Sequence, residues 1–208
     1  MTNNNYEIYS NIDCQKRNMA FTSKQLITSN NDLINYLKKI PKAFRLINKG
    51  KFIINFDKLH YISPKDISGK KMAIIVNSLH SENINNNDSN DNVNSVGHWI
   101  LLLFNLQKKE CLLIENLDYL YKNRMDIKQS IDMYCTSHNF LLKDFGLKSQ
   151  NFSAKSCGFQ IIYYLWFFAY NGLTKFELLK RRLKDYSLIE REKYILRRSY
   201  KLCKYGAF

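Results

Sequence analysis

A long apolar and aromatic run, CGFQIIYYLWFFAY over residues 157–170, constrains the fold more than any other part of the chain. Its length and composition predict a helix that begins at about Cys157 and is buried on nearly all sides. A cysteine at a helix N-terminus meets unsatisfied backbone N–H groups and the positive end of the helix dipole, and both favour its thiolate. Gly158 lets another backbone or a substrate approach the sulfur. Cys157 is therefore a candidate nucleophile, and the alternative interpretation is a small buried hydrophobic side chain.

A cysteine nucleophile needs an imidazole within hydrogen-bonding reach and a third group that orients this imidazole. Among the four histidines, His98 lies directly before the apolar run 100–104, at the mouth of a predicted strand. Residues 111–115 are typical of the return strand of a hairpin, which brings Glu115 back to His98. If residue 98 pairs with 115 the two face each other, and if the register slips by two they are diagonal neighbours on one face. In both registers Glu115 can bind one ring nitrogen of His98 and leave the other for Cys157.

Gln150 completes a candidate catalytic set. Its side-chain amide can donate to the oxyanion of a tetrahedral intermediate, beside the backbone N–H of Cys157. Sixteen residues separate His98 from Glu115, and six separate Gln150 from Cys157. This order and spacing is far more specific than any single motif.

The set resembles the adenovirus maturation protease and its relatives, which share a clan with the SUMO-specific proteases. Those enzymes have a His-Trp pair, an acidic residue at the same distance downstream and a Gln-x6-Cys-Gly element, in this order. The acid is Glu in the adenovirus type and usually Asp in the SUMO type, so Glu115 favours the former. The resemblance covers roughly residues 50–170, in pieces, and includes the upstream segments 56–58, 62–64 and 73–77.

The resemblance implies a cysteine endopeptidase that cleaves capsid or core precursors, after small residues or Gly, during virion maturation. The resemblance also implies a double-stranded DNA virus as the source, such as a virophage or Polinton-like element, and the abundant Asn, Lys and Ile are typical of an AT-rich genome. The implied location is the virion and the host cytoplasm or nucleus. A SUMO- or ubiquitin-like-specific isopeptidase and a non-catalytic polyanion-binding module are the alternatives. The implied catalytic residues are His98, Glu115, Gln150 and Cys157, with Trp99 and Gly158 supporting substrate and oxyanion.

No cofactor is expected for the chemistry, whereas the resemblance implies DNA or a viral peptide as activators. The cysteine that binds the activating peptide covalently in the adenovirus enzyme aligns with Asn139, and Cys135 is the nearby alternative. The five cysteines form no CxxC pair and no metal-ligand spacing with the histidines, so no metal site is expected. We expect them to stay reduced, in a cytosol or nucleus.

The C-terminal part, about residues 174–204, is strongly basic in a chain of net charge +14. Two predicted capping boxes, at 174–177 and 187–190, each open a basic amphipathic helix. This pattern predicts either a face that binds double-stranded DNA or a solvated basic surface. The DNA-binding interpretation rests on these arginines: Arg181, Arg182, Arg197 and Arg198.

With 45% apolar and 14% aromatic residues, the chain is expected to be a single globular domain over residues 1–208. We expect an α+β fold in which a central, mostly antiparallel sheet is packed by helices in a papain-like or adenain-like arrangement. Further expected elements are a helix over 33–39, strands over 52–56 and 72–79, and a helix followed by a strand over 125–141.

Residues 81–96 form a polar, low-complexity insert directly before Gly97 and His98. It is either an inert flexible loop or a flap that gates substrate. No apolar run is long enough to span a membrane, so no membrane partner is expected.

Overall fold

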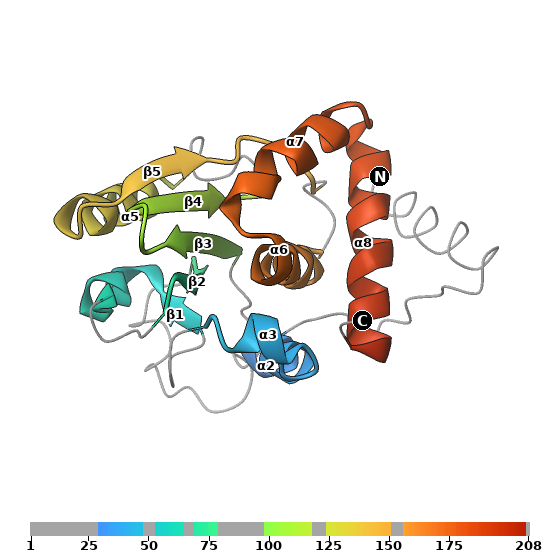
Figure 1. Cartoon of the computed structure of the whole chain (residues 1–208), viewed down its shortest axis with the longest axis horizontal. Coiled ribbons are helices and arrows are strands. Elements are labelled where there is room, and N and C mark those ends of the chain that lie inside the picture. The colour runs from blue at the N-terminus through green and yellow to red at the C-terminus, as the bar shows by residue number, and fades with distance from the viewer. Residues whose placement is uncertain are drawn as a thin grey trace, which may run out of the picture.

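A five-stranded sheet organises the chain (Figure 1). The computed structural model describes residues 29–47, 53–64, 69–78, 98–117, 124–150 and 156–206. In this part, the predicted α+β class is confirmed. The strands are, in spatial order, β1 (Ile53–Asn55), β2 (Lys71–Asn77), β3 (Trp99–Asn105), β4 (Glu110–Ile114) and β5 (Leu141–Asp144).

The sheet is mixed rather than mostly antiparallel. The three central strands pair antiparallel, whereas β1 on β2 and β5 on β4 are parallel. In the β3–β4 hairpin Leu101 pairs with Ile114. The register slipped by two is therefore the one found, and His98 and Glu115 are diagonal neighbours at the same end of the hairpin.

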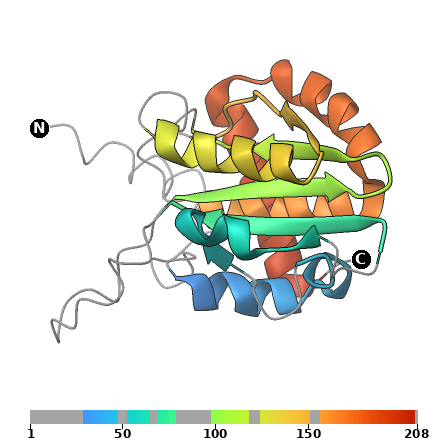
Figure 2. The same ribbon diagram turned by 90° about the vertical axis from the view of Figure 1, so that its left-hand side faces the viewer.

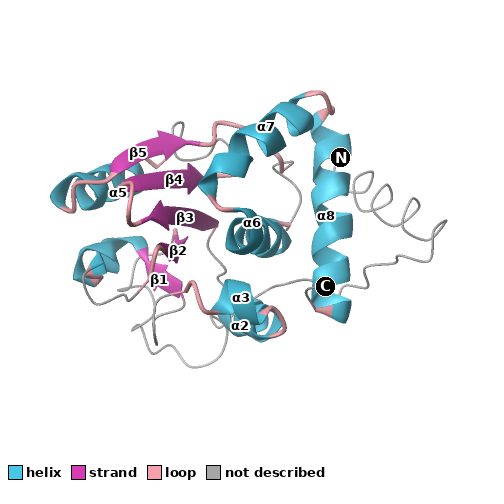
Figure 3. Cartoon of the chain, in the orientation of Figure 1, coloured by secondary structure: helices cyan, strands magenta, loops and turns pink. Residues whose placement is uncertain are grey.

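The central strands are apolar on both faces because helices cover both. In β3, Trp99, Leu101 and Leu103 belong to one buried cluster, and the alternate residues belong to the other. One face carries the 3-10 helix η2 (Phe56–Tyr61) and α5 (Met125–Ser137), which lie in front of the sheet in Figure 2. Figure 3 shows the strands between the two groups of helices.

The other face carries the remaining helices, with α6 against the sheet and α8 on the outer side of α6 (Figure 1). Their bounds are α2 (Asn30–Lys38), α3 (Pro41–Phe44), α6 (Cys157–Asn171), η5 (Leu173–Lys175), α7 (Phe176–Lys184) and α8 (Leu188–Tyr205). The predicted start of α6 at Cys157 is confirmed, and all side chains from Phe159 to Leu165 are buried. None of the described helices is both long and apolar enough to cross a membrane.

Some local predictions need correction. Strand β1 is shorter than the run 52–56, because residues 56–61 turn into η2. The capping box at Ser187 is confirmed, but Thr174 caps no helix: it lies inside η5, and α7 begins at Phe176 without a side-chain cap. The insert 81–96 lies outside the described residues.

Candidate active site

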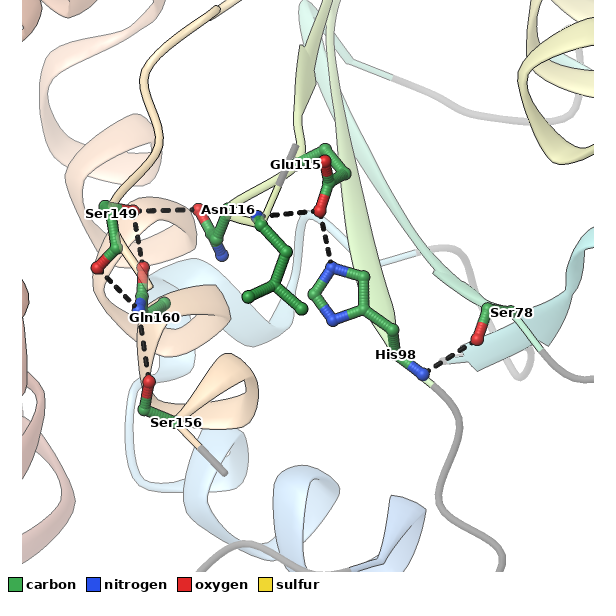
Figure 4. A network of polar contacts seen from close by, with 8 residues as sticks. Ser78, His98, Glu115, Asn116, Ser149, Ser156 and Gln160 are labelled. Carbon is green, nitrogen blue, oxygen red and sulfur yellow. Dashed lines mark hydrogen bonds and ion pairs between the residues drawn. The ribbon is translucent and has the colours of Figure 1, made fainter. Parts of the chain in front are cut away.

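A histidine–glutamate pair lies at one end of the β3–β4 hairpin (Figure 4). His98, directly before β3, places its Nε2 2.8 Å from Oε1 of Glu115, directly after β4. The same carboxylate oxygen accepts from the backbone N–H of Leu117 at 2.8 Å. The backbone N–H of His98 donates to Ser78 Oγ at the end of β2, also at 2.8 Å. Both partners are thus held by the ends of neighbouring strands.

Cys157 lies beside the same imidazole. Its side chain is close enough to the His98 ring to act on the pKa of that ring as a hydrogen-bonding neighbour, while Nε2 faces Glu115. Cys157 is the first residue of α6, and the N-cap Ser156 makes no side-chain capping bond to the helix. The positive end of the helix dipole therefore faces the sulfur without a side-chain cap. The three residues of the predicted triad come together as the spacing predicts.

Cys157 also differs from the other described cysteines in accessibility. It is partly exposed, whereas the other three are buried: Cys111, Cys135 and Cys203. Burial, together with the neighbouring Cys135, raises the pKa of the Cys111 thiol well above its usual range. Burial likewise raises the pKa of Cys203 to about 12. Among the described cysteines, Cys157 is the most exposed residue.

The environment of His98 favours its charged form. Burial alone would lower the pKa of this ring, whose side chain is 9% exposed. Hydrogen bonds with Cys157 and Glu115, and the charges of these two groups, act in the opposite direction and raise the pKa to about 9. The net effect of these neighbours is to favour the protonated ring.

Gln150 lies beside the end of β4 that carries Glu115. Its backbone N–H donates to the carbonyl of Asn116 at 3.1 Å, and the N–H of Ser149 donates to the same oxygen. Gln150 is buried, with 2% of its surface exposed. Asn116, the residue after the candidate acid, thus anchors the segment that carries the candidate oxyanion donor.

A buried polar network, which the sequence analysis did not identify, joins this segment to α6 (Figure 4). Its centre is Gln160, one turn after Cys157, and its other members are Asn116, Ser149, Ser156 and Tyr164. The sequence held one signal for it: Gln160 is a polar residue inside an otherwise apolar run, and such a residue needs hydrogen-bonding partners when it is buried.

The two predicted supporting residues lie close to the triad in the chain. Trp99 is completely buried, and its Nε1 donates to Asn30 Oδ1 of α2 at 2.9 Å. No part of Trp99 is exposed, and this bond joins the start of β3 to α2. Gly158 is buried as the second residue of α6.

The basic helices carry their own surface feature. Arg181, Arg182, Arg197 and Arg198 are all exposed. The guanidinium carbons of Arg182 and Arg198 lie 5.2 and 5.4 Å from the ring centroid of Tyr194. An open hollow of about 700 Å³ runs along α8, and its lining residues are Tyr186, Glu190, Lys193, Tyr194, Arg197, Arg198 and Lys201. This hollow includes no residue of the His98–Cys157 site.

Cys135 and Asn139, the candidate positions for covalent activation, lie at the C-terminal end of α5. Cys135 is 1% exposed, on the side of α5 that faces the sheet, and Asn139 follows the end of that helix with a φ of 58°. In the part of the chain that the structure describes, no three His, Cys, Asp or Glu side chains are grouped so that they could hold a metal ion.

The sequence matches no protein-family model and no curated protein. The geometry of the site is therefore the basis for a functional assignment.

Proposed function

We propose that the protein is a cysteine endopeptidase. The observation that carries this proposal is the position of a single buried imidazole, His98, between the Glu115 carboxylate and the sulfur of Cys157 at a helix N-terminus. An imidazolium and a helix N-terminus both favour a thiolate, and a thiolate is the nucleophile that acyl transfer requires. A papain-like or adenain-like arrangement is part of the proposal, supported by α6 packing against β3, the strand that directly follows His98.

In the proposed reaction the Cys157 thiolate attacks the carbonyl carbon of a peptide bond. The carbonyl electrons move to oxygen, and the oxyanion accepts hydrogen bonds from the Gln150 amide and the Cys157 backbone N–H. When the intermediate collapses, the C–N bond breaks and His98 gives its proton to the leaving amine. His98 then takes a proton from water, whose oxygen attacks the thioester and releases the acid and the thiolate. Glu115 orients the ring throughout.

The proposed substrates are capsid or core precursors of a double-stranded DNA virus, cut after small residues or Gly. The resemblance to the adenovirus-type enzymes supports this, through the Gln150, Cys157 and Glu115 pattern. The proposed sites of action are the virion and the host cytoplasm or nucleus.

One experiment tests the activity and separates the alternatives. Candidate capsid precursors and a ubiquitin-like protein fused after Gly-Gly are incubated with the protein, and new termini are mapped by mass spectrometry. Cleavage of precursors, absent with Cys157→Ala, supports the endopeptidase. Cleavage of the fusion alone favours an isopeptidase. If neither substrate is cut, the peptidase proposal fails and the non-catalytic polyanion-binding module remains.

We also propose that the α7–α8 surface binds double-stranded DNA. The observation that favours this is the hollow along α8, where exposed cations flank the ring of Tyr194. Lys and Arg side chains on such a surface release counterions from the phosphate backbone when they bind it. DNA or a viral peptide as an activator is part of the same proposal.

A further inference from the structure

The two proposed oxyanion donors come from separate pieces of the fold. Gln150 follows β5 and is attached to the hairpin through Asn116, whereas the N–H of Cys157 belongs to the first turn of α6. An oxyanion hole works only when its donors aim at the same point, because misplaced donors lose the charge stabilisation that drives the reaction. Something must therefore fix the Gln150 segment relative to the start of α6.

Gln160 makes this connection with its whole amide group. Its Oε1 accepts from Ser149 Oγ at 2.6 Å, and its Nε2 donates to the Ser149 carbonyl at 3.0 Å and to Ser156 Oγ at 3.2 Å. Ser149 directly precedes Gln150, and Ser156 directly precedes Cys157. One side chain thus holds the residue before each donor.

Gln160 is completely buried, so water cannot replace these bonds. Tyr164, one turn further along α6, donates to Ser149 Oγ at 3.2 Å, and Asn116 Oδ1 is a second acceptor near the serine hydroxyl at 3.2 Å. Each polar atom of the Gln160 side chain therefore has a defined partner. A buried side chain whose polar atoms are all bonded in this way is held in one arrangement.

Helix α8 also bonds to the chain just before each of the two proposed donors. The Arg191 guanidinium donates to the carbonyl of Lys148, and the Glu192 carboxylate accepts from Ser156 Oγ at 2.6 Å. Lys148 lies two residues before Gln150, and Ser156 directly precedes Cys157. The residues before the two donors are therefore bonded both to α6 and to α8.

We propose that Gln160 is a positioning residue of the oxyanion hole, which fixes the Gln150 amide relative to the Cys157 backbone N–H. This inference rests on the proposed peptidase function. It predicts a defect in turnover that leaves the nucleophile itself intact, because in the described part of the chain the hydrogen bonds of the Gln160 side chain go to Ser149 and Ser156 and not to His98 or Glu115.

The test compares Gln160→Leu with a matched control, Ser199→Ala. Ser199 is also completely buried and bonds α8 to α6 through the Phe159 carbonyl at 2.6 Å. Within the described residues, its hydroxyl makes no hydrogen bond to Ser149, Gln150 or Ser156. The assay uses a peptide that releases a fluorophore after Gly-Gly. Gln160→Leu should lower kcat by about 10-fold or more with little change in KM, since one lost oxyanion donor costs on the order of 10²-fold or more. Ser199→Ala should change kcat by less than about 2-fold, because it disturbs no donor.

Alkylation of Cys157 by iodoacetamide supplies the readout that a general structural defect would change. This displacement forms no oxyanion, so the rate for Gln160→Leu should stay within about 2-fold of the wild-type rate. Combined with Gln150→Ala, Gln160→Leu should add no further loss of kcat, because the residue it positions is already absent. Ser149→Ala, which keeps the Ser149 carbonyl, should lower kcat by a smaller factor and likewise leave KM and the alkylation rate nearly unchanged.

Three results would overturn the proposal: a kcat equal to that of Ser199→Ala, an alkylation rate that falls in parallel with kcat, or a multiplicative loss in the double variant. If Gln160→Leu does not fold, Ser149→Ala decides by the same comparisons. A wild-type protein that cleaves no peptide but alkylates normally at Cys157 would overturn the peptidase proposal, and the positioning role with it. An active wild type with any of the first three results would overturn the positioning role alone.

Discussion

At the scale of single residues, His98 is the member of the candidate triad that neighbours both of the others, Glu115 and Cys157. Its backbone bonds to Ser78 and its ring bonds to Glu115, and Cys157 neighbours the same ring. Each contact comes from a different strand end or helix end, so a substitution that moves any of these ends affects the same ring. The consequences for each partner can be measured separately.

Cys157 should be the thiol that iodoacetamide modifies first near neutral pH. It lies beside the His98 ring at the N-terminus of α6, the setting typical of reactive cysteines, and its partial exposure admits the reagent. Brief labelling followed by mass spectrometry checks this, and Cys157→Ala should abolish peptide cleavage while keeping the fold. Faster labelling of Cys111 or Cys203 would contradict the assignment.

The raised pKa of His98 should appear in an NMR titration. The ring should titrate at about 9 in the wild type, and its pKa should be lower in Glu115→Gln, which removes a carboxylate that favours the imidazolium. A group whose pKa rises on folding stabilises the fold fully below its ordinary value of 6.5, and this contribution is lost as pH rises through about 9. The fall in unfolding free energy over that window should therefore be smaller in Glu115→Gln. A titration that is the same in both proteins would contradict the ion pair.

The loss of kcat when each supporting residue is replaced should depend on what that residue does in the transition state. Gln150→Ala should lower kcat by about 10²-fold with little change in KM, because an oxyanion donor acts mainly there. Glu115→Ala should cost less than His98→Ala, since orienting a base matters less than having one. Asp118→Ala is the control, and steady-state kinetics on a fluorogenic peptide supplies the ranking. If Asp118→Ala lowered kcat as much as His98→Ala, and Glu115→Ala left kcat unchanged, the acid of the triad would be misassigned.

Much of this residue-level arrangement could be predicted from the sequence. His98 and Glu115 were found because a hairpin of regular strands has only a few registers, and each of them brings the two residues together. Gln160 and Asn116 were missed because their roles depend on which segment packs above them. Local pattern does not encode that information: a buried glutamine in a helix bonds whatever tertiary neighbour is present.

At the scale of the elements, strands were more predictable than their pairing. The apolar runs of β2, β3 and β4 identify buried strands. The parallel pairings of β1 and β5 depend on how long connections cross the sheet, and no residue at either strand signals this. Strand β5 is also largely exposed, so it lacks the apolar run that identified the others.

The two predicted capping boxes give a matched test at this scale. Ser187 accepts from the Glu190 N–H and its own N–H donates to the Glu190 carboxylate, whereas Thr174 lies in η5 and caps nothing. Ser187→Ala should lower the free energy of unfolding by about 1 kcal/mol, the usual cost of a lost N-cap. Thr174→Ala should cost less than about 0.5 kcal/mol, as expected of a surface change without such a role. Urea denaturation checks both, and equal costs would contradict the assigned start of α7.

At the scale of the whole molecule, the basic surface of α7 and α8 is separate from the candidate site. The chain carries 32 Lys and Arg against 18 Asp and Glu. On α7 and α8 the apolar residues Phe176, Leu183 and Ile195 face inward, which leaves the cations on the outer surface. A catalytic site built from His98, Glu115 and Cys157 needs no such surface. The excess of positive charge therefore calls for a test of its own.

Double-stranded DNA should bind this surface without sequence preference, because the described part of α7 and α8 presents cations and no recognised base-reading motif. If about five phosphates are neutralised, log affinity should fall with log salt at a slope of about −4 to −5. Fluorescence anisotropy of a labelled duplex measures this. Reversal of Arg181, Arg182, Arg197 and Arg198 to Glu should weaken binding strongly and leave cleavage of a short free peptide unchanged, since the hollow along α8 contains no catalytic residue.

The matched control reverses four exposed lysines elsewhere on the molecule: Lys58, Lys70, Lys108 and Lys109. Both variants change the net charge equally, so a difference between them reports the location of the binding surface and not the overall charge. The arginine variant should lose most of the affinity and reduce the salt slope by about 0.9 for each phosphate contact removed, whereas the lysine variant should keep the wild-type slope. Equal losses in the two variants would mean that DNA responds only to net charge. No binding at low salt would mean that the cations on α7 and α8 form a solvated surface.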